Sequence, residues 1–75
     1  MVKAIITLKL GKTITVDNLL HISKNDGFTD LVTDFTQFLF TAHNESPYSF
    51  VFVGETTSIT VAEKELVSVE FSKEL

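Results

Sequence analysis

The side chains that could carry out chemistry in this chain are few, and their spacing limits what they could do. Asp30 and Asp34 lie four residues apart, so on a helix their carboxylates would share one face and could hold a divalent cation or act as an acid–base pair. A zinc site would need two further ligands converging with His21 and His43, and neither histidine has a partner four residues along. We therefore expect a solvent-exposed acidic face, with no metal site and no cofactor.

Nucleophilic and phosphate-binding chemistry find equally little support. The chain has no cysteine, and no serine has an evident histidine–acid arrangement around it. Gly11-Lys12-Thr13 matches the end of a phosphate-binding loop, but the first glycine of that motif would fall on Ile6, inside a strand-like run. The sequence therefore predicts that the protein is not an enzyme.

The charge of the chain is divided unevenly. The net charge is −4, with four lysines against one acid in residues 1–25 and two lysines against nine acids in residues 26–75. Arginine, which supplies bidentate contacts to phosphate and guanine, is absent. We therefore expect no nucleic-acid partner.

Targeting signals are also missing from the sequence. The N-terminus lacks the charged region, long apolar run and cleavage site of a secretory signal, and no apolar stretch approaches the roughly 18 residues of a membrane span. Without cysteine a disulfide scaffold is excluded. We expect one cytoplasmic domain over residues 1–75, with no membrane partner.

Alternating apolar residues predict strands in both halves of the chain. Residues 2–10 and 13–16 predict a hairpin around Gly11. The second run either continues as a strand to Ile22 or forms a helical turn after Asp17, and we favour the strand. Three further strands are predicted, at residues 48–53, 58–61 and 66–71.

The central segment predicts one helix, at about residues 27–43. From Phe28 onward apolar residues recur at helical spacing in a stripe roughly 100° wide, with Phe38 at its rim. Asp26 is a suitable N-cap, and Pro47 prevents continuation. The predicted class is α+β in ββαβββ order, a mostly antiparallel sheet with the amphipathic helix packed on one face. The helical crossover could bring the first and last strands together in parallel.

The segment from Gly11 to Thr15 resembles a known family. Its sequence, Gly-Lys-Thr-Ile-Thr, is identical to the turn and strand start of the first hairpin of ubiquitin, whose β-grasp family has ββαββ order. The resemblance covers five residues and implies a β-grasp-like topology. Ser72–Leu75 lacks the paired glycines used for conjugation, and no functional residue is carried over.

Apolar residues exceed what one helix-covered sheet face can bury, and this surplus is the main functional clue. Tyr48, Phe50 and Phe52 form an aromatic row on one face of a predicted strand, while Val51 and Val53 occupy its other face. A sheet that curls strongly would bury the row within the monomer; otherwise the row is an exposed cluster. The candidate interaction surface comprises Ile5, Phe40, Tyr48, Phe50 and Phe52.

Two functional hypotheses follow. The first is a small non-enzymatic protein-interaction or adaptor protein that binds a protein partner or, through an apolar sheet face, a second copy of itself. The alternative is an acidic regulatory or inhibitory protein that blocks a basic site on its partner as a nucleic-acid mimic. The alternative requires one continuous negative patch, for which the candidate acidic face is Asp30, Asp34 and Glu45.

Overall fold

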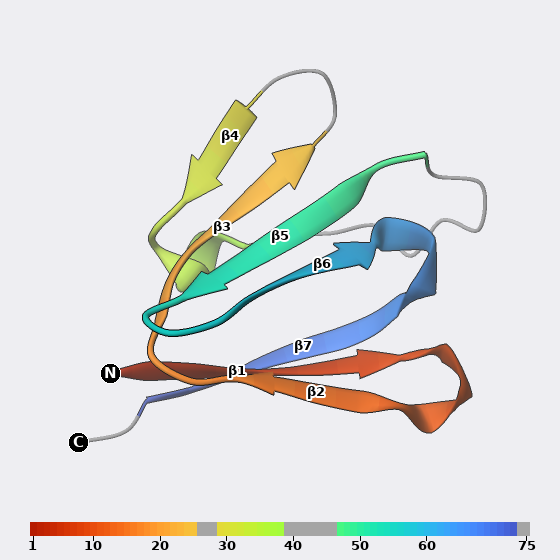
Figure 1. The fold of residues 1–75 in the computed structure, drawn as a ribbon, viewed down its shortest axis with the longest axis horizontal. Helices are drawn as coiled ribbons and strands as arrows, with labels where there is room; N and C mark the ends of the chain where they lie inside the picture. The colour runs from red at the N-terminus through yellow and green to blue at the C-terminus, as the bar shows by residue number, and fades with distance from the viewer. Residues whose placement is uncertain (26–28, 39–46, 74–75) are drawn as a thin grey trace.

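The computed structural model describes residues 1–25, 29–38 and 47–73, which form two antiparallel sheets (Figure 1). Sheet A has the strand order β2-β1-β7 and sheet B has the order β4-β3-β5-β6. Three short 3-10 turns complete the elements in the described part of the chain. The strands are β1 (Val2–Leu8), β2 (Thr13–Val16), β3 (Leu19–Asn25), β4 (Thr29–Val32), β5 (Ser49–Gly54), β6 (Ser58–Ala62) and β7 (Leu66–Lys73), and the turns are η1 (Lys9–Gly11), η2 (Phe35–Gln37) and η3 (Glu63–Glu65).

The predicted helix over residues 27–43 is wrong, and with it the α+β class and the β-grasp-like topology. The described part of that segment forms β4 and then η2, and no α-helix occurs among the described residues. β-Branched residues such as Val32 and Thr33 favour extended backbone. The Asp34 carboxylate then accepts hydrogen bonds from the backbone N–H of Thr36 at 3.2 Å and from its hydroxyl at 2.6 Å, which supports a single turn.

The chain passes from sheet A to sheet B between β2 and β3. Asn18 has a φ of 52°, a left-handed conformation that asparagine tolerates better than most residues. The backbone N–H of Glu55 donates to the Asn18 carbonyl at 3.1 Å, which ties this crossing to the β5–β6 turn. A Cβ at Gly54 would lie 2.7 Å from the Asp17 carbonyl oxygen, so the close approach requires glycine. Residues from Leu19 onward are therefore extended, as favoured, but the continuous strand is wrong: they form a separate strand, β3, in the other sheet.

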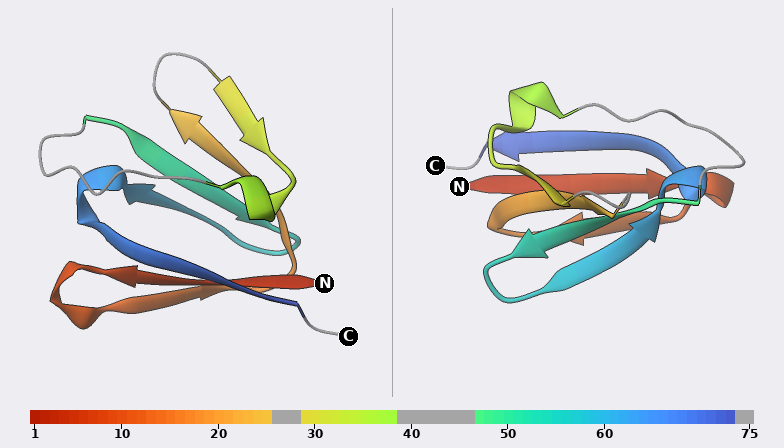
Figure 2. Two further views of the ribbon diagram at one scale, coloured as in Figure 1. Left: turned by 180° about the vertical axis from the view of Figure 1, so that it is seen from behind. Right: turned by 90° about the horizontal axis from the view of Figure 1, so that it is seen from above.

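The first and last strands are neighbours, but antiparallel rather than parallel. β1 lies between β2 and β7, and its pairs run from Val2 opposite Lys73 to Leu8 opposite Leu66. The return comes from η3, which connects β6 in one sheet to β7 in the other (Figures 1 and 2). A corner of three residues is enough to reverse the chain, so no long crossover is needed.

The core lies between the inner faces of the two sheets. Two aromatic residues at and just after η2 close one side of it: Phe35 stacks on Phe71 with ring centroids 5.2 Å apart, and Phe38 meets Phe50 edge-on at 5.2 Å. Phe38, expected at the rim of a helix, therefore packs against the core cluster. The buried apolar residues are Ala4, Ile6, Val16, Leu19, Ile22, Phe50, Phe52, Val61 and Leu66.

Candidate interaction surface

The apolar residues of β5 alternate between the core and the surface. Phe50 and Phe52 are 3% and 0% exposed, so the exposed cluster expected around these two rings is wrong. Val51 and Val53 alternate with them and lie on the opposite face, partly exposed. The second sheet thus covers the aromatic row and leaves the valine side of β5 facing outward.

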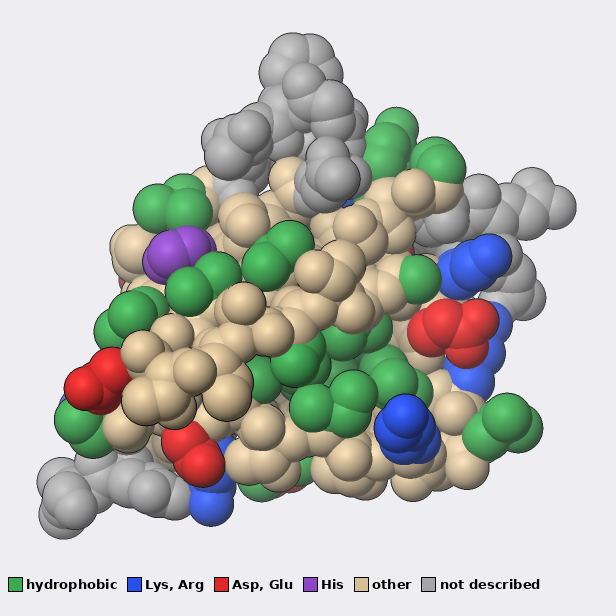
Figure 3. All heavy atoms as spheres, in the orientation of Figure 1, with side chains coloured by type: hydrophobic (Ala, Val, Ile, Leu, Met, Phe, Trp, Pro, Cys, Tyr) green, Lys and Arg blue, Asp and Glu red, His purple; other side chains and the backbone are tan. Residues whose placement is uncertain are grey.

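The outer face of sheet B combines apolar and neutral polar residues in two of its described rows. One row runs across the sheet through the paired residues Leu31, Ser23, Val51 and Thr60, and the next through His21, Val53 and Ser58. Neither row contains Asp, Glu, Lys or Arg. Leu31 is 58% exposed, and hydrophobic side chains gather over β4, β3 and β5 on the face seen in Figure 3. We call these two rows the sheet B face.

The outer face of sheet A is different. In its rows Ile5 lies between Thr15 and Glu70, Thr7 lies between Thr13 and Ser68, and Lys3 pairs with Ser72. Ile5 is partly buried, and its two cross-strand neighbours are polar or charged. Ile5 therefore sits alone among polar residues and does not join the aromatic row with which the sequence grouped it.

The other predicted residues are only partly brought together. Tyr48 is 40% exposed just before β5. Asp34 is exposed and engaged with Thr36 at η2. Phe40 and Glu45 lie outside the described residues, as does the side chain of Asp30, whose backbone pairs with that of Lys24. Of the candidate acidic face, the structure thus places only the Asp34 carboxylate.

A charged pair at the end of the core escaped the sequence reasoning. Lys24 Nζ lies 3.7 Å from Glu63 Oε2, with the two side chains 33% and 5% exposed. The same ammonium lies 5.6 Å from the ring centroid of Tyr48 and 5.7 Å from that of Phe50. The signal was the position of Lys24 two residues after Ile22, which places both on the inner face of β3.

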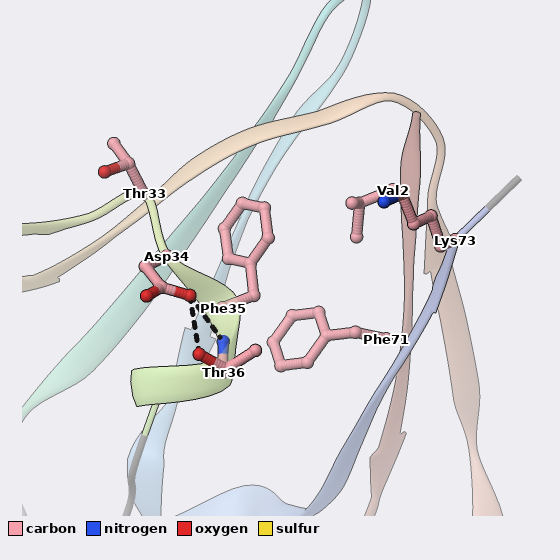
Figure 4. A pocket seen from close by; sticks show the side chains of 7 residues that line it. All are labelled: Val2, Thr33, Asp34, Phe35, Thr36, Phe71 and Lys73. Carbon is pink, nitrogen blue, oxygen red and sulfur yellow. Dashed lines mark hydrogen bonds between the residues drawn. The ribbon is translucent and has the colours of Figure 1, made fainter.

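An open pocket lies where η2 meets the ends of β1 and β7 (Figure 4). Its volume is about 360 Å³, and the stacked rings of Phe35 and Phe71 form part of its wall. Asp34 and Lys73 are its charged lining residues; the others are Val2, Thr33, Phe35, Thr36 and Phe71. His21 is not among its described lining residues, His43 lies outside the described residues, and no group of three His, Asp or Glu side chains suited to a metal ion occurs in the described part of the chain.

No family model, no curated protein and no solved structure matches this chain. No helix in the described part of the chain is long and apolar enough to cross a membrane. The sheet B face is the most distinctive surface feature of the described residues, and it supports the functional conclusion.

Proposed function

We propose that the protein is a small non-enzymatic binding module that docks a protein partner on the sheet B face. The observation that supports this is the combination, on one sheet face, of Leu31 at 58% exposure with Val51 and Val53, and of two full rows without a charged residue. Outward positions on a chain of net charge −4 usually carry charges for solubility. A face without formal charge that exposes apolar side chains favours contact with another protein.

Binding through such a face does not remove charged groups of this chain from water. Burying an ion without a well-placed counter-ion costs several kcal/mol. A partner that covers Val51 and Val53 would displace water from apolar surface and leave no charge of this chain buried at those rows. We therefore infer a partner with a flat apolar patch of its own, met in the cytoplasm, where a chain without cysteine needs no oxidising compartment.

The test is site-specific photo-crosslinking from two matched positions. Thr60 on the sheet B face and Thr15 on the outer face of sheet A are both exposed threonines paired with a central strand. A photoreactive residue at position 60 should give a discrete adduct in cells that make the protein, and one at position 15 should not. Loss of the adduct in a Val51→Lys background would support the proposal. Equal labelling from both positions would contradict it.

A further inference from the structure

The tip of the β1–β2 hairpin presents a leucine in a conformation that few leucines adopt. Leu10 has φ 71° and ψ 13°, and its side chain is fully exposed, at 105% of the reference value. This left-handed region strains a side chain with a Cβ, and glycine or asparagine usually occupies it. The Leu8 N–H donates to the Lys12 carbonyl at 2.7 Å and holds the turn closed. Neither the strain nor the exposure is offset by any burial of Leu10 within its own chain.

The apolar pocket lined by Phe35 and Phe71 lies at the opposite end of the same sheet. Val2 and Lys73, which pair at the far end of β1, both line it. The hairpin tip follows Leu8 at the other end, and both views of Figure 2 show the tip and the termini at opposite ends of the molecule. A volume of about 360 Å³ leaves ample room for a four-carbon side chain beside the rings, since one liquid water takes only about 30 Å³.

The charges around the tip and the pocket allow one ion pair between them. Lys9 and Lys12 flank Leu10 and are exposed, while Asp34 lies exposed at the pocket. A leucine seated in the pocket beside the stacked rings of Phe35 and Phe71 would bring a flanking lysine toward that carboxylate. Lys73 also lines the pocket, so Asp34 is the one acidic residue among the described lining that could pair with a lysine of the tip.

We propose that the Leu10 tip of one copy docks into the pocket of a second copy, so that the protein associates head to tail. The two contact surfaces differ and lie at opposite ends, so the contact is heterologous and continues as an open chain rather than closing as a dimer. One apolar anchor with an exposed ion pair falls well short of a standard interface, so the association is weak, with a dissociation constant of about 1 mM. This contact is independent of the sheet B face.

Sedimentation of the full chain from about 20 μM to about 2 mM tests the proposal, because this range brackets the expected dissociation constant. The average mass should rise continuously with concentration and pass beyond that of a dimer. Leu10→Asn keeps the turn, since asparagine accepts left-handed backbone, and should lower the association constant about tenfold or more. Leu31→Asn is the matched control, an exposed leucine on the sheet B face, and should leave the head-to-tail association unchanged.

Three results would overturn the proposal. One is a monomer throughout the concentration range. Another is an association that Leu10→Asn leaves intact. The third is a mass that stops at the dimer and falls with Leu31→Asn, which would assign self-association to the sheet B face and support the proposed function instead. Conversely, Leu10→Asn could abolish the association while photo-crosslinking from position 60 gives no adduct. That result would support the tip contact and contradict the proposed function.

Discussion

The two sheets of this protein share one core but turn different outer faces to solvent. On sheet A the outward rows are mostly Thr and Ser, with Lys3 and Glu70 among them. On sheet B the corresponding rows carry no Asp, Glu, Lys or Arg, and Leu31, Val51 and Val53 alternate there with serine, threonine and histidine. Both sheets are antiparallel and both use alternate residues for the core. The core therefore does not dictate the outward residues, and under the proposed function the difference between the faces comes from the partner that sheet B docks.

The largest expected effect separates the two sides of β5. Phe52→Ala should lower the free energy of unfolding by about 3–5 kcal/mol, because the ring is fully buried and its removal leaves a cavity. Val53→Ala, one residue along on the outer side, should cost less than about 1 kcal/mol. Urea denaturation measures both, with Phe52→Leu as a milder variant if Phe52→Ala does not fold. Equal losses at the two positions would contradict the assignment of the faces.

A smaller effect is expected from the charged pair on the inner side of sheet B. Glu63→Gln should cost about 1–2 kcal/mol, below the 3–5 kcal/mol of a fully buried pair, because the Lys24 side chain is 33% exposed and partly screened by water. Urea denaturation of Glu63→Gln, Lys24→Met and the double variant measures the coupling between them. A coupling of zero would show that the pair does not support η3.

The hairpin tip of sheet A should respond in the opposite direction. Leu10→Asn should raise the free energy of unfolding by about 0.5–1 kcal/mol, since it relieves left-handed strain without removing any buried contact. For a domain of this size that corresponds to a rise in Tm of a few degrees. Calorimetry would measure it, with Thr13→Asn on the same hairpin as the control. A fall in Tm would mean that the leucine stabilises the isolated chain.

The smallest expected change in stability comes from charging the outer faces. Val51→Lys and Ile5→Lys both place an ammonium on a partly exposed position of a central strand. Each should alter the free energy of unfolding by about 0.5 kcal/mol or less, because the long side chain can reach water. Denaturation midpoints check this, and a loss of several kcal/mol at either position would show that the residue belongs to the core.

The strands at both ends of the chain could be predicted because alternation is a local signal. β1 and β2 lie where the sequence predicts them, and so do β5 to β7, within a few residues. The central segment could not be predicted in this way. Leu31, Val32 and Phe35 have helical spacing, yet a strand followed by a short turn places Val32 and Phe35 against the core and leaves Leu31 exposed. Packing between sheets decided this, and spacing does not reveal it.

The candidate surface was predicted only in part, because alternation is a local signal and packing between sheets is not. The sequence separates Phe50 and Phe52 from Val51 and Val53, and that division is confirmed. Which side faces a second layer depends on how the two sheets meet, and that contact joins residues far apart in the sequence. With a helix expected to cover a single sheet, the aromatic side was a candidate surface, and its burial within the monomer was the alternative. The second sheet places it in the core.

The most direct test of the sheet B face combines its two matched charge variants with the crosslinker at position 60. Crosslinking yield is compared in Val51→Lys and Ile5→Lys backgrounds, because the two residues occupy equivalent central-strand positions on the outer faces of the two sheets. If sheet B docks the partner, Val51→Lys abolishes the adduct and Ile5→Lys leaves its yield unchanged. An adduct that survives Val51→Lys and disappears with Ile5→Lys would contradict the account.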